Sequence, residues 1–414
     1  MDFFEVTAVL VTLAALASYL NYRFIGLPNT IGIMVITLVA SLAVTLVSLA
    51  GLPLEDTAQQ VLDAIDLNEA FLHGMLGFLL FAGALHINLE DLGRQKGTIA
   101  SLATVGVLVS TLLVGGLSYL ALDLVGLHTP FMVCLLFGAL ISPTDPIAVL
   151  GIMTRVGAPK SLEVKVAGES LFNDGVGVVV FLTVLSLVKQ SRGITPSEVG
   201  LHFVEEMVGG AVFGLAIGLA GYFFLKSVDN YQVEALLTLS LVFGGYALAD
   251  ALHISGPIAM VVAGLLIGNH GRALAMSDTT RERLDDFWEL IDAGLNSVLF
   301  ALLGIEILVL PFTTRHLLAG LLIIPVVLFA RYLTVGGVVM ALRFRRSFTP
   351  GAVRVLVWGG LRGGISVALA LSLPDVPARS VIIVMTYVVV VFSIVVQGLT
   401  VGRLIRRVVP VEVR

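Results

Sequence analysis

Long apolar stretches follow one another along the whole chain, separated by gaps too short to hold a soluble domain. A helix that crosses the hydrocarbon core of a bilayer needs about 20 mostly apolar residues. Thirteen stretches of this kind lie at about 3–21, 28–50, 68–87, 98–120, 130–153, 166–188, 203–225, 232–250, 255–268, 288–310, 317–340, 351–373 and 380–402. They predict an all-α membrane protein of about 13 transmembrane helices, forming a single unit over residues 1–414 rather than two or three soluble domains.

Composition supports this class and excludes several functions. Hydrophobic residues make up 57% of the 414 residues and charged residues 13%, where soluble proteins carry about 25% charged residues. The net charge of −5 comes without any basic cluster, which argues against nucleic acid as a partner. The single cysteine, Cys134, excludes an internal disulfide and a cysteine metal site. We find no nucleotide-binding loop, expect no cofactor, and expect no cleavable signal because the chain opens with Met1-Asp2.

Basic residues between the stretches predict the orientation in the membrane. Loops facing the cytoplasm carry the excess of Lys and Arg. The loop after the first stretch and every second loop from there, with the C-terminal tail, hold seventeen basic residues, and the opposite loops hold four. The split predicts an odd number of spans in the cell membrane, with the N-terminus outside and the C-terminus in the cytoplasm.

Thirteen stretches divide into two sets of six joined by a linker. We predict a first repeat at about 3–188, a linker helix at 203–225, a second repeat at 232–402 and a short cytoplasmic tail at 403–414. Because the linker spans once, the second six would run opposite to the first, as in an inverted repeat. The fifth stretch contains Ser142-Pro143-Thr144-Asp145-Pro146 and the twelfth contains Gly359-Gly360-Leu361-Arg362-Gly363-Gly364. Prolines break helices and glycines loosen them, so both helices should be interrupted, which indicates a transporter binding site between the halves.

Four ionisable residues inside these stretches stand out: Asp145, Glu169, Asp174 and Arg362. Ionisable groups in a membrane are costly and are functional candidates by default. Ser170 and Asp174 are four residues apart and share one helix face, and Glu169 and Asn173 share the adjacent face.

Oxygen ligands on these residues suit a hard cation. Asp174, Asp145, Ser170 and the Thr144 hydroxyl, with carbonyls freed near Pro143 and Pro146, would supply them. The same carboxylates bind protons, and burial and a neighbouring like charge favour the protonated form. A site that holds either a proton or a cation is the core of an exchanger.

The buried charges need partners, since an unpaired guanidinium would cost several kcal/mol. For Arg362 we expect a static clamp with Glu169, with Asn173 bridging the pair. Arg331 also lies deep in a stretch and requires a carboxylate or a lipid phosphate, which the sequence does not identify.

Four motifs together resemble the monovalent cation/proton antiporter family. They are Thr144-Asp145-Pro146, Glu169-Ser170-Leu171-Phe172-Asn173-Asp174-Gly175, Gly304-Ile305-Glu306 and Gly360-Leu361-Arg362-Gly363-Gly364. The resemblance covers nearly the whole chain. It is strongest to the prokaryotic sodium/proton antiporters related to animal sodium/hydrogen exchangers.

The resemblance implies a homodimer in which a domain carrying the ion moves against a scaffold domain. It implies that Asp174 binds the ion, that Asp145 is the second acidic position and that Glu169 and Arg362 form a scaffold pair. Asn173 precedes the essential aspartate, and in the family asparagine there accompanies electroneutral one-for-one exchange. The prediction is therefore secondary active sodium/proton exchange by alternating access, serving pH homeostasis, and not an enzyme activity.

Other functions remain as alternatives. A potassium/proton antiporter, a channel or a solute symporter would fit the same fold, since ion selectivity depends on cavity geometry. An intramembrane aspartyl protease also uses two membrane aspartates, but Asn173 and Arg362 would have no role in it.

Several polar residues receive structural interpretations. His73, His86 and His253 are expected to be satisfied at helix interfaces. Asp292 and Glu306 lie near the ends of stretches, where we expect water around them. The segment 277–290 is expected to form a separate surface helix.

Overall fold

Helices account for all regular elements of the part of the chain that the structure describes. This structure is a computed structural model, and it describes residues 3–49, 75–189, 196–272, 276–308, 313–344, 346, 348–373 and 378–409. Each of the thirteen predicted stretches contains helix within these residues. The start of the third stretch, with His73, lies outside them. The prediction of an all-α membrane protein is confirmed, while the division into two inverted repeats stays a prediction.

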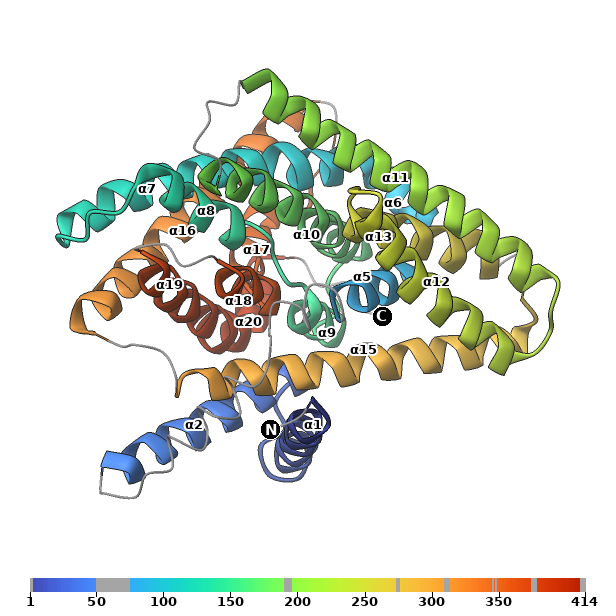
Figure 1. Ribbon diagram of the computed structural model, residues 1–414, viewed down its shortest axis with the longest axis horizontal. Coiled ribbons are helices and arrows are strands. Elements are labelled where there is room, and N and C mark those ends of the chain that lie inside the picture. The colour runs from blue at the N-terminus through green and yellow to red at the C-terminus, as the bar shows by residue number, and fades with distance from the viewer. Residues whose placement is uncertain are drawn as a thin grey trace.

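The helices form two groups that pack mainly within themselves (Figure 1). The α15 group comprises α1 (Phe3–Leu20), α2 (Asn29–Leu49), α5 (Leu76–Leu85), α11 (Pro196–Lys226), α12 (Tyr231–Ala251), α13 (Gly256–Leu266) and α15 (Asp278–Glu306). The α10 group comprises α6 (Leu89–Ser101), α7 (Val107–Leu124), α8 (Phe131–Ile141), α9 (Ile147–Arg155), α10 (Lys160–Lys189), α16 (Thr314–Leu342), α17 (Ala352–Trp358), α18 (Gly364–Leu371), α19 (Arg379–Phe392) and α20 (Gly398–Val408). Across the boundary, α10 contacts α13 and α11.

Short π-helical segments continue four of these helices. They are η1 (Asn21–Ile25) after α1, η3 (Leu102–Gly106) between α6 and α7, η4 (Ile267–Gly271) after α13 and η5 (Ser393–Gln397) between α19 and α20. Such segments inside α-helices often occur at functional sites. Here η5 supplies Ser393 and Gln397 to the interior of the α10 group.

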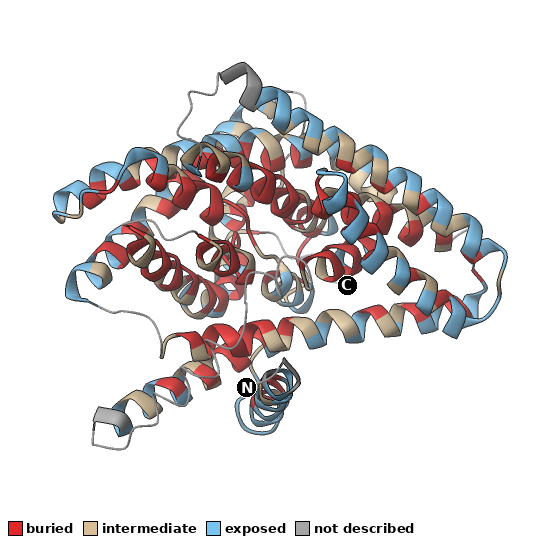
Figure 2. Cartoon of the chain, in the orientation of Figure 1, coloured by how far each residue is buried: buried red, intermediate tan, exposed pale blue. Residues whose placement is uncertain are grey.

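Burial follows a pattern expected for a protein surrounded by lipid. The middle of α10, together with α8, α18 and α19, is mostly buried, and the outer faces of α7, α11 and α12 are exposed (Figure 2). Large apolar side chains populate those exposed faces, among them Leu112, Phe223 and Phe243. In the described residues, nine helical segments are long and apolar enough to cross a membrane by length and composition, and three shorter apolar helices accompany them.

Both predicted interruptions are present. The fifth stretch is divided into α8 and α9, and the twelfth into α17 and α18. Pro143 and Pro146 lack the amide hydrogens that a continuous helix would need there. The two breaks meet: the Asp145 amide donates a hydrogen bond to the Leu361 carbonyl at 2.8 Å, and the two residues form an isolated antiparallel bridge. The two interrupted helices are thus joined through their backbones at the centre of the α10 group.

The segment 277–290 is not a separate surface helix. It forms the first half of α15, which runs without interruption from Asp278 to Glu306. Leu284 and Trp288 are buried against the protein, while the charged side chains between them lie on the more exposed face. Because one face is buried along the whole length, the polar half continues directly into the apolar half.

Candidate functional site

The central turns of α10 carry four buried polar side chains. Glu169, Ser170 and Asn173 are each about 1% exposed and Asp174 is 8% exposed. Their spacing places Ser170 and Asp174 on one face and Glu169 and Asn173 on the next, as the sequence predicted. The two faces contact different parts of the protein.

Asn173 and Ser170 hold the interruption of the fifth stretch against α10. The Asn173 amide donates to the Thr144 hydroxyl at 2.9 Å and accepts from the Thr144 backbone amide at 3.2 Å. The Ser170 hydroxyl donates to the Thr144 carbonyl. Thr144 is therefore fixed at its amide, carbonyl and hydroxyl by two residues of one helix. Asn173 does not bridge Glu169 and Arg362 as expected.

Asp145 follows directly and lies two residues before the start of α9 at Ile147. Its carboxylate accepts a hydrogen bond from the Ile147 amide at 3.0 Å, while its own amide bonds to Leu361 in the other break. A Cβ atom at Gly363 would collide with the Asp145 carboxylate, so only glycine allows the two breaks to approach this closely. The second half of the chain thereby positions the acidic residue of the first half.

The carbonyls expected to be freed by the prolines already accept hydrogen bonds. Arg362 donates from one guanidinium nitrogen to the carbonyls of Ser142 and Pro143, both at 2.8 Å. The Pro146 carbonyl accepts from the Leu150 amide at 2.7 Å. Arg362 therefore supplies hydrogen-bond donors to the carbonyls at the C-terminal end of α8. Carbonyls at this end of a helix lack partners within the helix and carry partial negative charge.

Glu169 pairs with Arg331 rather than with Arg362, which corrects the expected scaffold pair. The Glu169 carboxylate lies 2.5 Å from the Arg331 guanidinium, and both side chains are buried. Arg331 also donates to the Leu356 carbonyl at 3.2 Å. Arg362 stays within electrostatic range of Glu169 and Asp174 without a direct ion pair to either. The partner that the sequence could not assign to Arg331 is Glu169 on α10.

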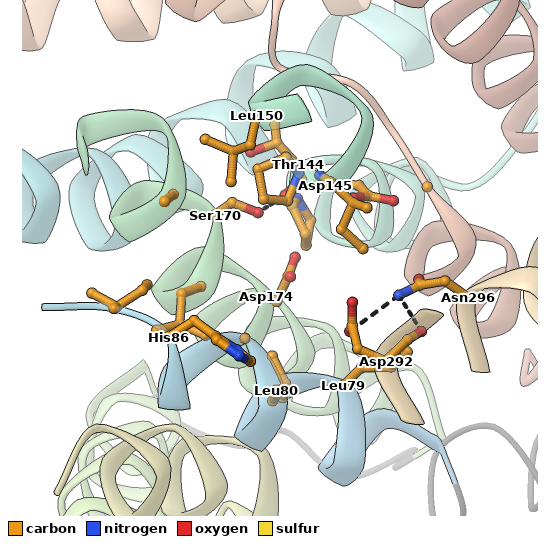
Figure 3. A pocket seen from close by; sticks show the side chains of 18 of the residues that line it. Leu79, Leu80, His86, Thr144, Asp145, Leu150, Ser170, Asp174, Asp292 and Asn296 are labelled. Carbon is orange, nitrogen blue, oxygen red and sulfur yellow. Dashed lines mark hydrogen bonds between the residues drawn. The ribbon is translucent and has the colours of Figure 1, made fainter. Parts of the chain in front are cut away.

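A cavity of about 480 Å³ brings the predicted ion-binding residues together (Figure 3). Asp174, Asp145, Ser170 and Thr144 all line it. From these buried groups it extends to exposed residues near the ends of α5 and α10, including Asn88 and Lys160. The cavity lies between the α10 group and the α15 group, because α5 and α15 form its opposite wall.

The Asp174 carboxylate points into this cavity (Figure 3). Within the described residues it accepts no hydrogen bond and forms no ion pair, although only 8% of the residue is exposed. A buried carboxylate without a partner is costly and requires a proton or a cation. The arrangement therefore suits a group that is alternately protonated and bound to a cation.

Two further polar residues of the cavity were missed by the sequence analysis. Asp292 and Asn296, on α15, line the wall opposite Thr144 and Asp145. We expected water around Asp292, because it lies near the end of a predicted stretch. Their spacing of four residues within an otherwise apolar stretch is the signal that would have revealed them. Glu306, also expected in water, is only 5% exposed.

Comparisons with known proteins show the family of the chain. Residues 10–407 match a family described as "Sodium/hydrogen exchanger, transmembrane". The chain is 52% identical over 409 residues to a protein named Na(+)/H(+) antiporter NhaP from Pseudomonas aeruginosa, covering 98% of this chain and 96% of that protein. It is 33% identical to the Na(+)/H(+) antiporter NhaH from Halobacillus dabanensis, over 97% of this chain and 95% of that one.

A solved structure shares the fold. The sodium proton antiporter MjNhaP1 from Methanocaldococcus jannaschii, at pH 8, superposes with a TM-score of 0.78, covering 99% of both chains at 21% sequence identity. The likeness extends over nearly the whole length of both chains. The match over residues 10–407 and the 52% identity to the Pseudomonas aeruginosa protein show that the chain belongs to the transmembrane sodium/hydrogen exchanger family.

Proposed function

We propose that the protein is a secondary active sodium/proton antiporter in which a proton and a sodium ion compete for Asp174. The observation that carries this proposal is the Asp174 carboxylate. It is buried, has no hydrogen-bond or ion-pair partner among the described residues, and lines a cavity that reaches exposed residues. Its relatives named as Na(+)/H(+) antiporters support the choice of ion.

The cation would be bound by oxygen atoms from two helices of the α10 group. Asp174 and Ser170 come from α10, and Asp145 and Thr144 come from the interruption between α8 and α9. Carboxylate and hydroxyl oxygens are suitable ligands for a hard cation. Since the backbone carbonyls nearby already accept hydrogen bonds, the two carboxylates would supply most of the attraction.

Coupling follows from the cost of moving charge through the membrane. With neither ligand bound, the site carries two carboxylates, and moving this pair through a low-dielectric barrier is strongly unfavourable. A proton or a sodium ion lowers that cost. The α10 group would then move against the α15 group and expose the site on the other side. Glu169, Arg331 and Arg362 would maintain the shape of the α10 group during this step.

We propose one-for-one electroneutral exchange because Asn173 adds no titratable charge next to Asp174. The Asn173 amide is fully engaged with Thr144. A carboxylate at this position would lose the donor to the Thr144 hydroxyl and add a second proton-binding group. The site therefore has one carboxylate on α10 to neutralise in each half-cycle.

The proposal also covers how the protein lies in the membrane and how it assembles. The protein would lie in the cell membrane as a homodimer, with its N-terminus outside. The residues at the mouth of the cavity belong to the loops with the excess of basic residues, so this conformation would open to the cytoplasm. Cross-linking of the purified protein would test the dimer.

Transport in proteoliposomes tests the function. A pH-sensitive dye reports proton movement when sodium, lithium or potassium is added, with Asp174→Asn as the paired variant. We expect sodium-dependent proton movement that is absent in the variant and unchanged when the membrane potential is held at zero. A response to potassium alone would favour potassium/proton exchange. No response from folded protein at several pH values would favour a symporter or a channel.

A further inference from the structure

We propose a second cation-binding position at Asp292 and Asn296 on α15, where a hydrated monovalent cation is held before it reaches Asp174. The proposal rests on the proposed function and deepens it. Asp174 and Asp145 belong to the α10 group, whereas this position belongs to the opposite wall of the cavity. It would attract and orient the ion without being part of the site that moves.

The two side chains hold each other in place. The Asn296 amide donates to the backbone carbonyl of Asp292 at 2.9 Å and to one Asp292 carboxylate oxygen at 3.1 Å. This leaves the second carboxylate oxygen of Asp292 and the side-chain oxygen of Asn296 without a donor among the described residues. Asn296 is only 2% exposed and lines the cavity. Oxygens that face a cavity and lack a protein donor are ready ligands for a cation or its water.

The position is distinct from the site at Asp174. In the described part of the chain, no three acidic, histidine or cysteine side chains are arranged to hold one metal ion together. Asp292 therefore does not complete a common shell with Asp145 and Asp174 in this conformation. It is nevertheless close enough to interact electrostatically with Asp145, so an ion at Asp292 lies within the field of the transport site.

Charges along the cavity favour cations. Asp91, Asp145, Asp174 and Asp292 line it, and the single lysine of the lining, Lys160, has Glu163 at 3.8 Å to offset its charge. His86 also lines the cavity and interacts electrostatically with Asp292. A cleft lined by one sign of charge raises the local concentration of the opposite ion.

The experiment measures the KM for sodium and Vmax in proteoliposomes for Asp292→Asn. Asparagine keeps the shape and can still accept the hydrogen bond from Asn296, so the fold is retained. Loss of one charge near the ion's path should raise KM about five-fold with Vmax unchanged. Two unit charges 4 Å apart in water attract each other by about 1 kcal/mol, which corresponds to about a five-fold change in affinity. Asp292→Glu, which restores the charge, should return KM toward the wild-type value.

Glu282→Gln is the matched control, because Glu282 is an exposed carboxylate farther along the same helix, does not line the cavity and is not among the charges that act on Asp292. It should leave KM unchanged. Raising the ionic strength with choline chloride should reduce the difference between Asp292→Asn and the wild type, because salt screens charges. An unchanged KM, or a fall in Vmax with no rise in KM, overturns the second position. If the wild type itself exchanges no sodium, the proposed function fails instead.

Discussion

Glu169 and Arg331 form a fully buried ion pair that ties α10 to α16. Taking two charges out of water is expensive, and a pair of this kind adds little stability compared with two apolar side chains. Removing one partner alone is far more damaging, because the other charge remains buried without compensation. The pair therefore makes the packing of these two helices specific.

We predict that Glu169→Gln and Arg331→Met each destabilise the protein by about 3–5 kcal/mol. The double variant should be more stable than either single variant, because it leaves no unpaired charge. Thermal unfolding of the purified proteins measures the three changes. If the double variant lost as much unfolding free energy as the two single variants together, the two side chains would act independently.

Asn173 offers a test of the sodium-to-proton stoichiometry, because replacing it by aspartate exchanges its side-chain nitrogen for an oxygen. Asn173→Asp adds a carboxylate beside Asp174, so a second proton can be carried and each cycle should move net charge. We expect the rate of sodium/proton exchange to respond to an imposed membrane potential in this variant. Asn173→Ala is the control, because it removes both hydrogen bonds to Thr144 without adding charge and should leave slower exchange insensitive to the potential. An Asn173→Asp protein that ignores the potential would contradict the assignment.

At the scale of single residues, the sequence predicted which polar residues lie together at the cavity better than it predicted their contacts. Asp145 and Asp174 were recognisable because ionisable groups are rare within apolar stretches. The partner of Glu169 was not, since both Arg331 and Arg362 lie deep in the second half and only helix packing decides between them. Asp292 was missed because it lies near the end of a stretch, directly after a polar segment, where we expected water around it.

At the scale of elements, the meeting of the two breaks decides where Asp145 lies. Pro143 and Pro146 predicted one break and the glycines 359–364 the other, so the existence of both could be read from the sequence. Their direct contact could not, because it joins residues separated by more than 200 positions. The continuity of α15 was also missed, since its first half has the charges of a surface helix.

Gly363→Ala should abolish transport while the protein still folds. The added methyl group would collide with the Asp145 carboxylate and displace it from the cavity. Gly337→Ala is the matched control, because a Cβ atom there meets nothing within 4 Å and alanine favours helix. Dye-monitored exchange and size-exclusion chromatography measure the two properties. Normal exchange by Gly363→Ala would show that Asp145 does not need its present position.

At the scale of the whole molecule, the predicted orientation can be tested with single cysteines. Cys134 is the only cysteine of the chain and is buried, so Cys134→Ala provides a background without thiols. In intact cells, a membrane-impermeant thiol reagent should label Arg315→Cys and should label Arg406→Cys only after permeabilisation. The opposite pattern would invert the topology and make the cavity open to the outside.

Arg362 and the carbonyl of Ser142 are separated by 220 positions in the chain, yet they share one of the hydrogen bonds that complete the site. During synthesis, the first broken helix therefore leaves the ribosome long before its partner exists. Its carbonyls at Ser142 and Pro143 have no arginine to bind them until the twelfth stretch has been made. The ion pathway is thus among the last parts of the protein to be assembled, so a nascent chain that lacks its final stretches cannot leak ions through a finished site.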